Sequence, residues 1–413
     1  MPIANPFAHP MYVMAKPAGS ACNLACKYCY YLEKQHLYKN EPHRIMSDEL
    51  LEKFVREYLE SLTTPEAMFT WHGGETLMRP LSFYEKVVRL QQQYGRSRRI
   101  ENSIQTNGTL LTADWCKFFK QNNWLVGISI DGPQEFHDEY RRNKSGAPSW
   151  AKVMRGIDLL NRYGVEWNAL AVVNDFNADY PLDFYRFFKE IGCHYLQFTP
   201  VVERLQAHAD GRMLASVEEG TEATLTDFSV TPAQWGEFLC AVFDEWVRQD
   251  VGEYFVQTFD ATLANWVGVT PGICSLSRNC GHAGAMEWNG DVYSCDHFVF
   301  PQYRLGNIYQ KSLVEMMYSP QQQEFGARKM GALPGQCRRC EWLFACNGEC
   351  PKNRFCRTRE GEAGLNYLCS GYRRFFSHVA PYMDFMKREL DAQRAPANVM
   401  EAVRKGLFKE ERN

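Results

Sequence analysis

Hydrophobic positions in residues 1–205 follow two alternating spacings. Short apolar runs rich in β-branched and aromatic residues predict strands, and longer segments with apolar residues three and four positions apart predict helices. The predicted strands are 11–16, 67–72, 100–106, 125–131, 165–173 and 193–202. The predicted helices are 47–62, 81–95, 112–123, 149–164 and 181–192. This alternation predicts right-handed βαβ units and a parallel sheet, as an incomplete β/α barrel or a doubly wound sheet.

The hydrophobic pattern changes after the sixth predicted strand. Residues 206–232 are polar and irregular, which predicts a surface loop or insertion, and residues 232–251 have the spacing of an amphipathic helix. Beyond about residue 270 the chain is rich in Cys and Gly with weak periodicity. We expect metal, and not a large core, to stabilise that part. A last helix is predicted at 377–393, before a charged tail.

Composition limits the classes of partner. The chain has 413 residues, a net charge of −3 and no apolar run near the ~20 residues of a membrane span. Its start, MPIANPFAHPM, lacks the basic and then apolar regions of a secretory leader. We therefore expect a cytoplasmic protein of two or more domains, or of one barrel plus an appendage, with no membrane or nucleic-acid partner.

The cysteines are unevenly distributed. Three of the 15 lie in the first 30 residues and nine lie between Cys274 and Cys369. In a reducing cytosol, such clusters more often bind metal than form disulfides. The scattered cysteines, which we predict to be small buried hydrophobes, are Cys116, Cys193 and Cys240.

Unusual residues follow the predicted strands. HGGE (72–75), QTNG (105–108), SIDGP (129–133) and TPVVE (199–203) each close a strand. Ligands of β/α folds bind beyond the carboxyl ends of the strands, so these motifs predict a site at one rim. The paired glycines of HGGE are expected to let backbone approach a ligand closely.

The first cysteine cluster, CNLACKYC, has the spacing C-x3-C-x2-C at Cys22, Cys26 and Cys29. Three thiolates on a four-iron cluster leave one iron open, whereas the alternative, a partial zinc site, lacks a nearby fourth ligand. With Tyr28 before the third cysteine and GGE after the second strand, the chain resembles the radical S-adenosylmethionine (SAM) superfamily. The resemblance implies a partial (β/α)6 barrel, SAM bound at the open iron, and cleavage of SAM to a 5′-deoxyadenosyl radical.

The second cluster, CRRCEWLFACNGEC, has the spacing C-x2-C-x5-C-x3-C. Alone it also fits a zinc ribbon, but with the first motif it resembles the SPASM extension, which carries two auxiliary [4Fe–4S] clusters. The resemblance implies two ligand sets: Cys274, Cys280, Cys295 and Cys350 for auxiliary cluster I, and Cys337, Cys340, Cys346 and Cys369 for auxiliary cluster II. Cys356 is left over; it could replace Cys350 or Cys369 as a ligand, but we expect a free thiol there.

Residues 10–380 resemble one subfamily, the anaerobic sulfatase-maturating enzymes. The resemblance rests on KPAGSACNLACKYCYY, the strand-end GGE, SIQTNGTLL, LVGISIDGP, LGNI and CDHF. It implies oxidation of Cys or Ser in a sulfatase's C/S-x-P-x-R motif to Cα-formylglycine, with an unfolded or nascent sulfatase as substrate and a flavodoxin or ferredoxin-type reductant. The family usually has Gln before GGE, where this chain has His72.

The resemblance also implies the residues that contact SAM. Gly73, Gly74 and Glu75 would hold its methionine end. The remaining contacts would be Tyr28 at the adenine through its backbone, Ser129 and Arg141 at the ribose and carboxylate, and Val202 at the adenine.

Asp296 is the predicted catalytic base, because it directly follows the expected cluster ligand Cys295. Next to an anionic cluster its pKa is expected to be raised. The alternative is a turn or surface aspartate. His282 and His297 lie in the same block and receive no role.

Four domains are expected: a radical SAM partial barrel (1–232), linking helices (233–269), a SPASM domain (270–376) and a C-terminal helix and tail (377–413). Three other functions remain open. Another SPASM peptide maturase would commonly carry an N-terminal recognition domain, for which a motif at residue 22 leaves no room. A radical SAM RNA-modifying enzyme would need basic, aromatic-interleaved surfaces. A non-enzymatic zinc module would contain no iron.

Overall fold

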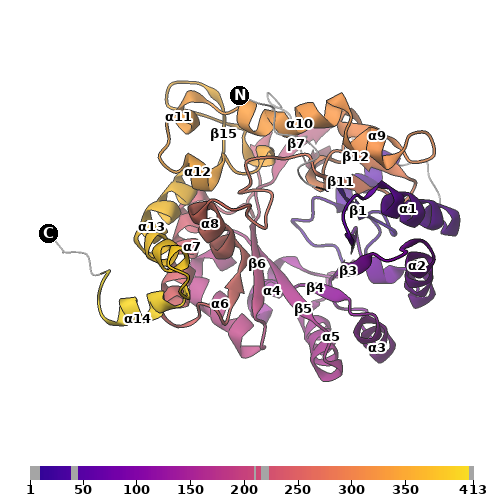
Figure 1. The fold of residues 1–413 in the computed structure, drawn as a ribbon, viewed down its shortest axis with the longest axis horizontal. Helices are drawn as coiled ribbons and strands as arrows, with labels where there is room; N and C mark the ends of the chain where they lie inside the picture. Colours follow the sequence, from indigo (N-terminus) through magenta and orange to yellow (C-terminus); the bar gives the residue numbers. More distant parts are fainter. Residues whose placement is uncertain (1–9, 39–44, 209–210, 215–222, 409–413) are drawn as a thin grey trace. The chain divides into compact units, whose positions relative to one another are not determined.

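The computed structural model describes residues 10–38, 45–208, 211–214 and 223–408. The chain forms two compact units (Figure 1). The first contains Met1–Ile130, His137–Trp167 and Cys280–Arg328, and the second contains Asp131–Phe136, Asn168–Asn279 and Lys329–Asn413. Each unit combines distant segments, so the four domains expected in chain order stay a prediction.

The sheet of the first unit has the strand order β4-β3-β2-β1-β11-β12-β13. Strands β1 to β4 and β11 are parallel, and β12 and β13 are antiparallel additions. Their bounds are β1 Tyr12–Ala15, β2 Glu66–Trp71, β3 Arg99–Thr106, β4 Leu125–Ser129, β11 Ala283–Met286, β12 Asp291–Tyr293 and β13 Arg304–Asn307. The first four confirm predicted strands. The last three lie where the sequence pattern predicted no element.

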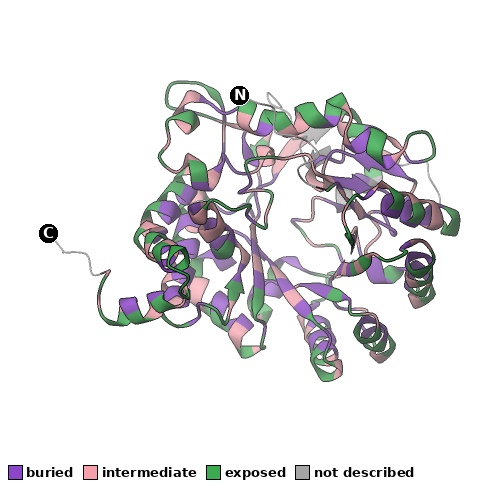
Figure 2. Cartoon of the chain, viewed as in Figure 1, coloured by how far each residue is buried: buried purple, intermediate pink, exposed green. Residues whose placement is uncertain are grey.

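Amphipathic helices connect the parallel strands of the first unit. They are α1 Asp48–Ser61, α2 Leu81–Tyr94, α3 Ala113–Gln121 and α5 Trp150–Tyr163, followed later by the short α9 Leu313–Met317. Each of the first four lies within a predicted helix. Ser47 caps α1 by accepting a hydrogen bond from Leu50 N, and Gly164 ends α5 with φ +62°. Figure 2 shows the buried side of these helices facing the strands, as the hydrophobic spacing requires.

The second unit contains its own parallel strands, β5 Trp167–Val173, β6 Tyr195–Pro200 and β10 Phe255–Val256. Its helices are α6 Pro181–Glu190, α7 Pro232–Gln249, α8 Gln257–Val267, α13 Cys369–Asp391 and α14 Asn398–Arg404. The Cys-rich part adds α11 Gly335–Arg338, α12 Leu343–Cys346, β14 Cys356–Arg357 and β15 Ala363–Leu365. Helices α4 Gln134–Tyr140 and α10 Pro320–Gly331 have residues in both units.

Two sequence expectations for the second unit are incomplete: the last helix begins earlier than expected, and of the two alternatives for 206–232, a surface loop or an insertion, the loop is wrong. The last long helix, expected at 377–393, begins at Cys369, because apolar residues at helical spacing continue back to Tyr372. The expected loop at 206–232 contains a three-stranded antiparallel sheet of β7 Arg204–His208, β8 Gly211–Leu214 and β9 Thr224–Leu225. Residues 209–210 and 215–222 of that expected loop lie outside the described residues.

Helix α13 lies very close to the start of α7 through glycine. A Cβ built on Gly371 would be 2.2 Å from the carbonyl oxygen of Pro232, and one built on Gly236 would be 2.9 Å from Gly371 Cα. Side chains at either position would separate the helices. This close approach fixes the first turn of α13, which carries Cys369. Among the described helices, none is long and apolar enough to cross a membrane.

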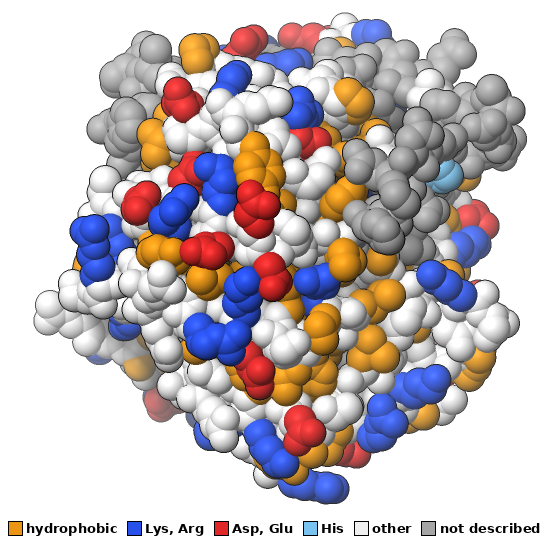
Figure 3. Space-filling model, turned by 90° about the vertical axis from the view of Figure 1, so that its right-hand side faces the viewer, with side chains coloured by type: hydrophobic (Ala, Val, Ile, Leu, Met, Phe, Trp, Pro, Cys, Tyr) orange, Lys and Arg blue, Asp and Glu red, His pale blue; other side chains and the backbone are white. Residues whose placement is uncertain are grey.

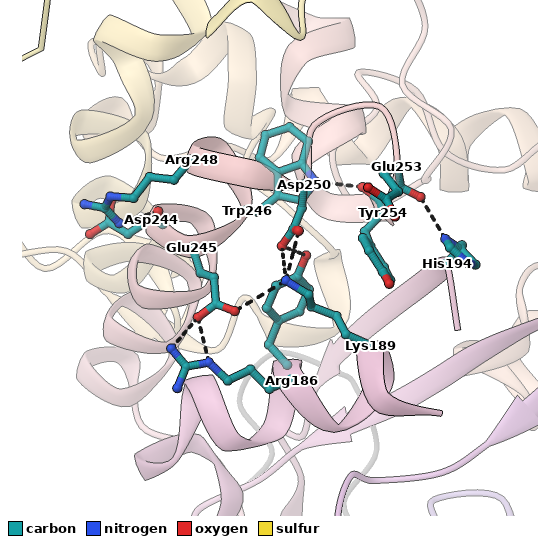
Figure 4. A network of polar contacts seen from close by, with 11 residues as sticks. Arg186, Lys189, His194, Asp244, Glu245, Trp246, Arg248, Asp250, Glu253 and Tyr254 are labelled. Carbon is teal, nitrogen blue, oxygen red and sulfur yellow. Dashed lines mark hydrogen bonds and ion pairs between the residues drawn. The ribbon is translucent and has the colours of Figure 1, made fainter. Parts of the chain in front are cut away.

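A polar network joins α6 to the end of α7 (Figure 4). Asp250 directly follows α7 and accepts hydrogen bonds from Tyr185 Oη at 2.9 Å and from Lys189 Nζ at 2.8 Å. Its side chain is only 4% exposed. Nearby, Arg186 pairs with Glu245 at 2.7 Å.

Replacing Asp250 with Ala should lower the free energy of unfolding by about 1–3 kcal/mol, because Tyr185 and Lys189 lose a buried acceptor while Lys189 keeps Glu245 at 3.6 Å. The matched control is Glu237→Ala on the same helix, whose pair with Arg374 is 60% and 54% exposed. That change should cost less than about 1 kcal/mol. Urea unfolding followed by far-UV circular dichroism measures both, and equal costs would contradict the prediction.

Candidate functional site

The loop carrying the first three cysteines directly follows β1 and is held by backbone. Ala25 N donates to Arg142 O at 2.8 Å, Lys27 N donates to Tyr140 O at 3.0 Å, and Leu24 forms a bridge with Asn143. Cys22, Cys26 and Cys29 are half-buried in this loop. A cluster held there is therefore attached to a fixed backbone.

The end of β3 holds the other side of this loop. Asn107 Nδ2 donates to Asn23 Oδ1 at 2.8 Å and approaches Cys22 Sγ at 3.8 Å. Leu24 N points at the same sulfur at 3.4 Å. Burial, with smaller contributions from neighbouring negative groups, raises the pKa of the Cys22 thiol to about 11. Two N–H groups aimed at one sulfur suit a thiolate that metal binding has deprotonated.

Glu75 is completely buried and bound to its own chain. Its Oε1 accepts from Leu77 N at 2.9 Å and Thr106 Oγ1 at 2.6 Å, and its Oε2 accepts from Asn107 N at 2.8 Å. Burial raises the pKa of Glu75, although these three hydrogen bonds oppose the rise. The carboxylate therefore joins the GGE turn to the end of β3. A carboxylate has about four acceptor positions, so one remains for a ligand.

Gly73 and Gly74 need to be glycine because a side chain at either position would collide with the backbone of this chain. A Cβ on Gly74 would lie 2.1 Å from the oxygen of Ala21, and one on Gly73, at φ +128°, would lie 2.8 Å from the oxygen of Gly19. Gly74 N and Glu75 N also donate to those two oxygens, both at 2.7 Å. The sequence interpretation, that these glycines make room for a ligand, misses this contact with the loop before Cys22.

The predicted ribose and carboxylate contacts have defined neighbours. Gln105 Nε2 donates to Ser129 Oγ at 3.0 Å, and Arg141 Nη1 donates to Tyr28 Oη at 2.8 Å. A Cβ on Gly127 would lie 2.1 Å from Gln105 Oε1, so this glycine leaves space for the Gln105 side chain. The side chain of Tyr28 is thus fixed by Arg141, which leaves its backbone for the predicted adenine contact.

The QTNG motif is the feature that sequence reasoning undervalued. The sequence predicts its position at the rim but no role for it. Its side chains contact three parts of the predicted SAM site: the end of β4, the GGE turn and the cysteine loop. Gln105 reaches Ser129, Thr106 reaches Glu75, and Asn107 reaches the loop of Cys22. The signal available in the sequence was three consecutive polar residues closing a buried strand.

Asp296 lies in a buried charged cluster. Its Oδ1 forms an ion pair with Lys16 Nζ, and its Oδ2 accepts a hydrogen bond from Tyr30 Oη at 2.5 Å. Lys16 is 0% exposed, and its Nζ is also 3.6 Å from Glu287 Oε1, which accepts from Tyr31 Oη at 2.5 Å. Sequence reasoning missed Lys16, although it begins the KPAG run before the cysteine loop.

The predicted raised pKa of Asp296 is wrong for this environment. Burial is the largest influence on the pKa of Asp296 and would raise it, but neighbouring positive charge, above all that of Lys16, places this pKa below its usual range. The carboxylate is therefore ionised at neutral pH. Cys29 and Cys295 also act electrostatically on the Tyr30 hydroxyl, which places this hydroxyl near both cysteine segments.

His72 is neutral at physiological pH. Burial is the largest influence on its pKa and lowers it, and the charge of Lys16 lowers it further. Gly73 N donates to His72 Nδ1 at 2.8 Å, so the ring proton of the neutral form is on Nε2. His72 thus offers one N–H donor, as the family's usual glutamine does. Of the two histidines without a predicted role, His282 and His297, the second has a tilted ring contact with Tyr30 at 5.0 Å.

Two predicted ligands of auxiliary cluster I belong to the first unit. Gln322, which is 2% exposed, donates to Gly281 O at 2.7 Å and to Ser294 O at 3.0 Å. One side chain therefore joins the backbone beside Cys280 to the backbone beside Cys295. Cys274 and Cys350, the other two, belong to the second unit, so this ligand set stays a prediction.

The four predicted ligands of auxiliary cluster II line one cavity of the second unit. The cavity has a volume of about 300 Å³, and its lining includes Cys337, Cys340, Cys346 and Cys369. Apolar side chains such as Trp342 and Tyr372 form part of its wall. Four thiols around one space of this size fit a four-iron cluster.

The remaining residues singled out from the sequence are Val202, Cys356 and the three scattered cysteines. Val202 is 2% exposed, and its carbonyl accepts from Lys352 Nζ at 3.0 Å. Cys356 is half-buried in β14, and its expected free thiol stays a prediction. The three scattered cysteines are buried, which confirms their structural reading, and burial raises the pKa of each: Cys116 to about 11, Cys193 to about 12 and Cys240 to about 11.

Charges are mixed on the face of the molecule drawn in Figure 3. Among the described residues there, Lys and Arg side chains alternate with Asp, Glu and hydrophobic ones, and no large area carries one sign. Nucleic-acid binding usually requires a basic patch or stripe, which this face does not offer.

Family models match two parts of the chain. Residues 17–188 match the radical SAM superfamily, and residues 280–341 match the SPASM iron–sulfur cluster-binding domain. The first range contains the cysteine loop, Glu75, Ser129 and Arg141. The second contains Cys295 and Asp296.

Relatives that match nearly the whole chain include anaerobic sulfatase-maturating enzymes of two types. A serine-type anaerobic sulfatase-maturating enzyme of Bacteroides thetaiotaomicron is 68% identical, with 98% of each chain covered. A cysteine-type enzyme of Clostridium perfringens is 32% identical, covering 90% of this chain and 97% of that one. A solved structure described as native anSMEcpe with bound AdoMet and Cp18Cys peptide aligns with a TM-score of 0.80 at 31% identity, covering 92% of this chain and 99% of that one.

Replacing Gly74 with Ala should remove the first cluster selectively, because the new Cβ would collide with the Ala21 carbonyl one residue before Cys22. After anaerobic reconstitution, iron per chain should fall by about one third, the share of one of three four-iron clusters, and SAM binding should be lost. The control is Gly331→Ala, where a Cβ meets nothing within 4 Å. Full iron content with normal SAM binding in the Gly74 variant would contradict this reading of the glycine pair.

Proposed function

The chain belongs to the anaerobic sulfatase-maturating enzymes of the radical SAM superfamily, and we propose that it oxidises the serine of a sulfatase's Ser-x-Pro-x-Arg motif to Cα-formylglycine. It is a radical SAM oxidoreductase with SAM, the SAM cluster and auxiliary iron–sulfur clusters as cofactors. The observation that carries the residue-level proposal is the ionised carboxylate of Asp296, bound by Lys16 and Tyr30 next to Cys295.

When bound, SAM and its cluster would supply the one-electron chemistry that removes a hydrogen atom from the target side chain. The following residues of this chain are proposed to hold the cofactors. Cys22, Cys26 and Cys29 hold the SAM cluster, and Glu75 orients the methionine end with its remaining acceptor position. The other proposed SAM contacts are Tyr28, Gly73, Gly74, Ser129, Arg141 and Val202.

Asp296 is the proposed base. Converting serine to formylglycine removes a hydrogen atom from Cβ, a proton from the hydroxyl and one further electron. An ionised carboxylate is ready to accept the hydroxyl proton. Lys16 is a buried cation that keeps this carboxylate charged before the reaction, and the Tyr30 hydroxyl fixes its direction.

Serine is the proposed target in preference to cysteine. The support is the degree of similarity: the serine-type relative is 68% identical, whereas the cysteine-type relative is 32% identical. The physiological substrate is proposed to be an unfolded sulfatase in the cytoplasm, and the reductant a flavodoxin or ferredoxin-type protein. Two four-thiolate clusters, with ligands Cys274, Cys280, Cys295 and Cys350 and Cys337, Cys340, Cys346 and Cys369, would carry the leaving electron.

The direct test uses two short peptides that differ only in Ser-x-Pro-x-Arg or Cys-x-Pro-x-Arg. The reconstituted enzyme, with SAM and a reductant under anaerobic conditions, should convert the serine peptide faster and give one 5′-deoxyadenosine per aldehyde. Mass spectrometry measures both products. 5′-Deoxyadenosine without aldehyde from either peptide would move the substrate to another peptide class.

Asp296→Asn should abolish aldehyde formation while preserving SAM cleavage, since asparagine keeps the shape but cannot accept the proton. The size expected of a lost general base is about 10²–10⁴-fold. The matched control is Asp291→Asn, a carboxylate of the same segment that pairs with Arg304. An Asp296 variant with unchanged aldehyde yield would remove this residue from the proposal.

His72→Gln should retain most activity, because glutamine restores an N–H donor at the position before GGE. His72→Leu, which is similar in bulk and has no donor, should lose about tenfold, the loss expected when the acceptor of one hydrogen bond is left without its donor. Aldehyde yield from the serine peptide compares the two variants. Equal loss in both would show that the imidazole has a role beyond donating a hydrogen bond.

A further inference from the structure

Arg354 is a buried cation that the proposed chemistry does not use. It is 7% exposed, and among the described residues its hydrogen-bond acceptors are backbone carbonyls. These acceptors are Gly348 O at 2.8 Å, Lys329 O at 2.5 Å, Asn347 O at 3.1 Å and Glu349 O at 3.0 Å. A guanidinium bound in this way keeps its full charge, since neutral carbonyls do not compensate it.

The turn around Arg354 has an unusual backbone. Asn347, Gly348 and Glu349 have φ values of +49°, +71° and +54°, so three consecutive residues are left-handed. Non-glycine residues pay about 1–2 kcal/mol each for this conformation. The turn spans the three positions between Cys346 and Cys350 and directs its carbonyls to Arg354. The cation site therefore lies between Cys346, a predicted ligand of auxiliary cluster II, and Cys350, a predicted ligand of auxiliary cluster I.

The carboxylate of Glu349 contributes an opposing charge, but it is hydrogen-bonded to other side chains. The Oε2 of Glu349 accepts from Asn366 Nδ2 at 2.6 Å and from Asn353 Nδ2 at 3.3 Å. Burial is the largest influence on the pKa of Arg354 and lowers it, while Glu349 and the thiolates of Cys350, Cys337 and Cys346 act in the opposite direction. A buried charge needs a compensating one, and those thiolates are predicted cluster ligands.

We propose that Arg354 is the buried counter-charge of the auxiliary iron–sulfur clusters and raises their reduction potential. On reduction a cluster with four thiolates gains one electron from the external reductant and becomes one charge more negative. A fixed cation nearby stabilises that form more than the oxidised one, and net charge is among the factors that set cluster potentials. Arg354 thus helps the auxiliary clusters accept the electron that leaves the oxidised side chain.

This inference rests on the proposed function for its cluster ligands, but its test needs no substrate. The full chain carrying Cys22→Ala, Cys26→Ala and Cys29→Ala retains only the auxiliary clusters. Redox titration of that chain, followed by electron paramagnetic resonance, measures their potentials. Failure of the sulfatase peptide assay would leave this measurement unaffected, so the two proposals fail separately.

Arg354→Gln removes the charge and keeps an N–H donor, whereas Arg354→Lys keeps the charge. In the Gln variant the ratio of reduced to oxidised cluster at a fixed potential should fall at least about tenfold, which is 59 mV for a one-electron couple. The Lys variant should stay near the parent. The matched control, Arg357→Gln, changes an exposed arginine of the same block that donates to Gly361 O at 2.8 Å, and it should leave the potentials unchanged.

Each outcome decides the proposal. A shift in the Gln variant alone supports it, as does loss of iron from the Gln variant with retention in the Lys variant. Equal shifts in both variants, or loss of iron from both, would make Arg354 a residue that only holds the turn. Unchanged potentials in both would also overturn the proposal.

Discussion

The parallel pairing of β1 with β11 is the interaction on which the site depends. Tyr12 is in register with Ala283, and Lys16 N, just beyond β1, donates to Met286 O at 2.9 Å. This pairing brings the segment of Cys295 and Asp296 to the strand that leads into the first cysteine loop. Without this pairing, no pair of strands in the first unit would join the loop of Cys22 to the segment of Cys295.

The pairing of β1 with β11 also brings the buried Lys16 to two carboxylates. A fully buried ammonium is costly unless it is paired, and here two carboxylates from the β11–β12 segment, Glu287 and Asp296, compensate it. The Tyr31 ring covers the ammonium at 3.7 Å, and the tyrosine hydroxyls occupy one oxygen of each carboxylate. The proposed base is therefore charged and oriented by the same few residues that connect the two segments.

The sequence was informative where chemistry is local. The strands up to β6, the amphipathic helices and the C-x3-C-x2-C loop follow from spacing, since burial of one face and metal ligation both impose a period. It was uninformative where partners come from distant segments. No periodicity indicates that β11 extends the first sheet, that Gly74 faces the Ala21 carbonyl, or that Lys16 reverses the expected pKa shift of Asp296. Glu349 illustrates the limit, since its left-handed backbone, whose carbonyl accepts from Arg354, does not follow from the propensity of glutamate.

The β1–β11 pairing also sets an order of events during synthesis. Strand β1 and its cysteine loop leave the ribosome about 270 residues before β11, the later of the two strands that pair with β1. At about 5–20 residues per second, this interval is on the order of tens of seconds. Throughout it, Lys16 has neither of its carboxylates and one edge of β1 is open. The first cysteine loop therefore emerges early and reaches its final surroundings late, so insertion of its cluster is expected to follow release of nearly three quarters of the chain.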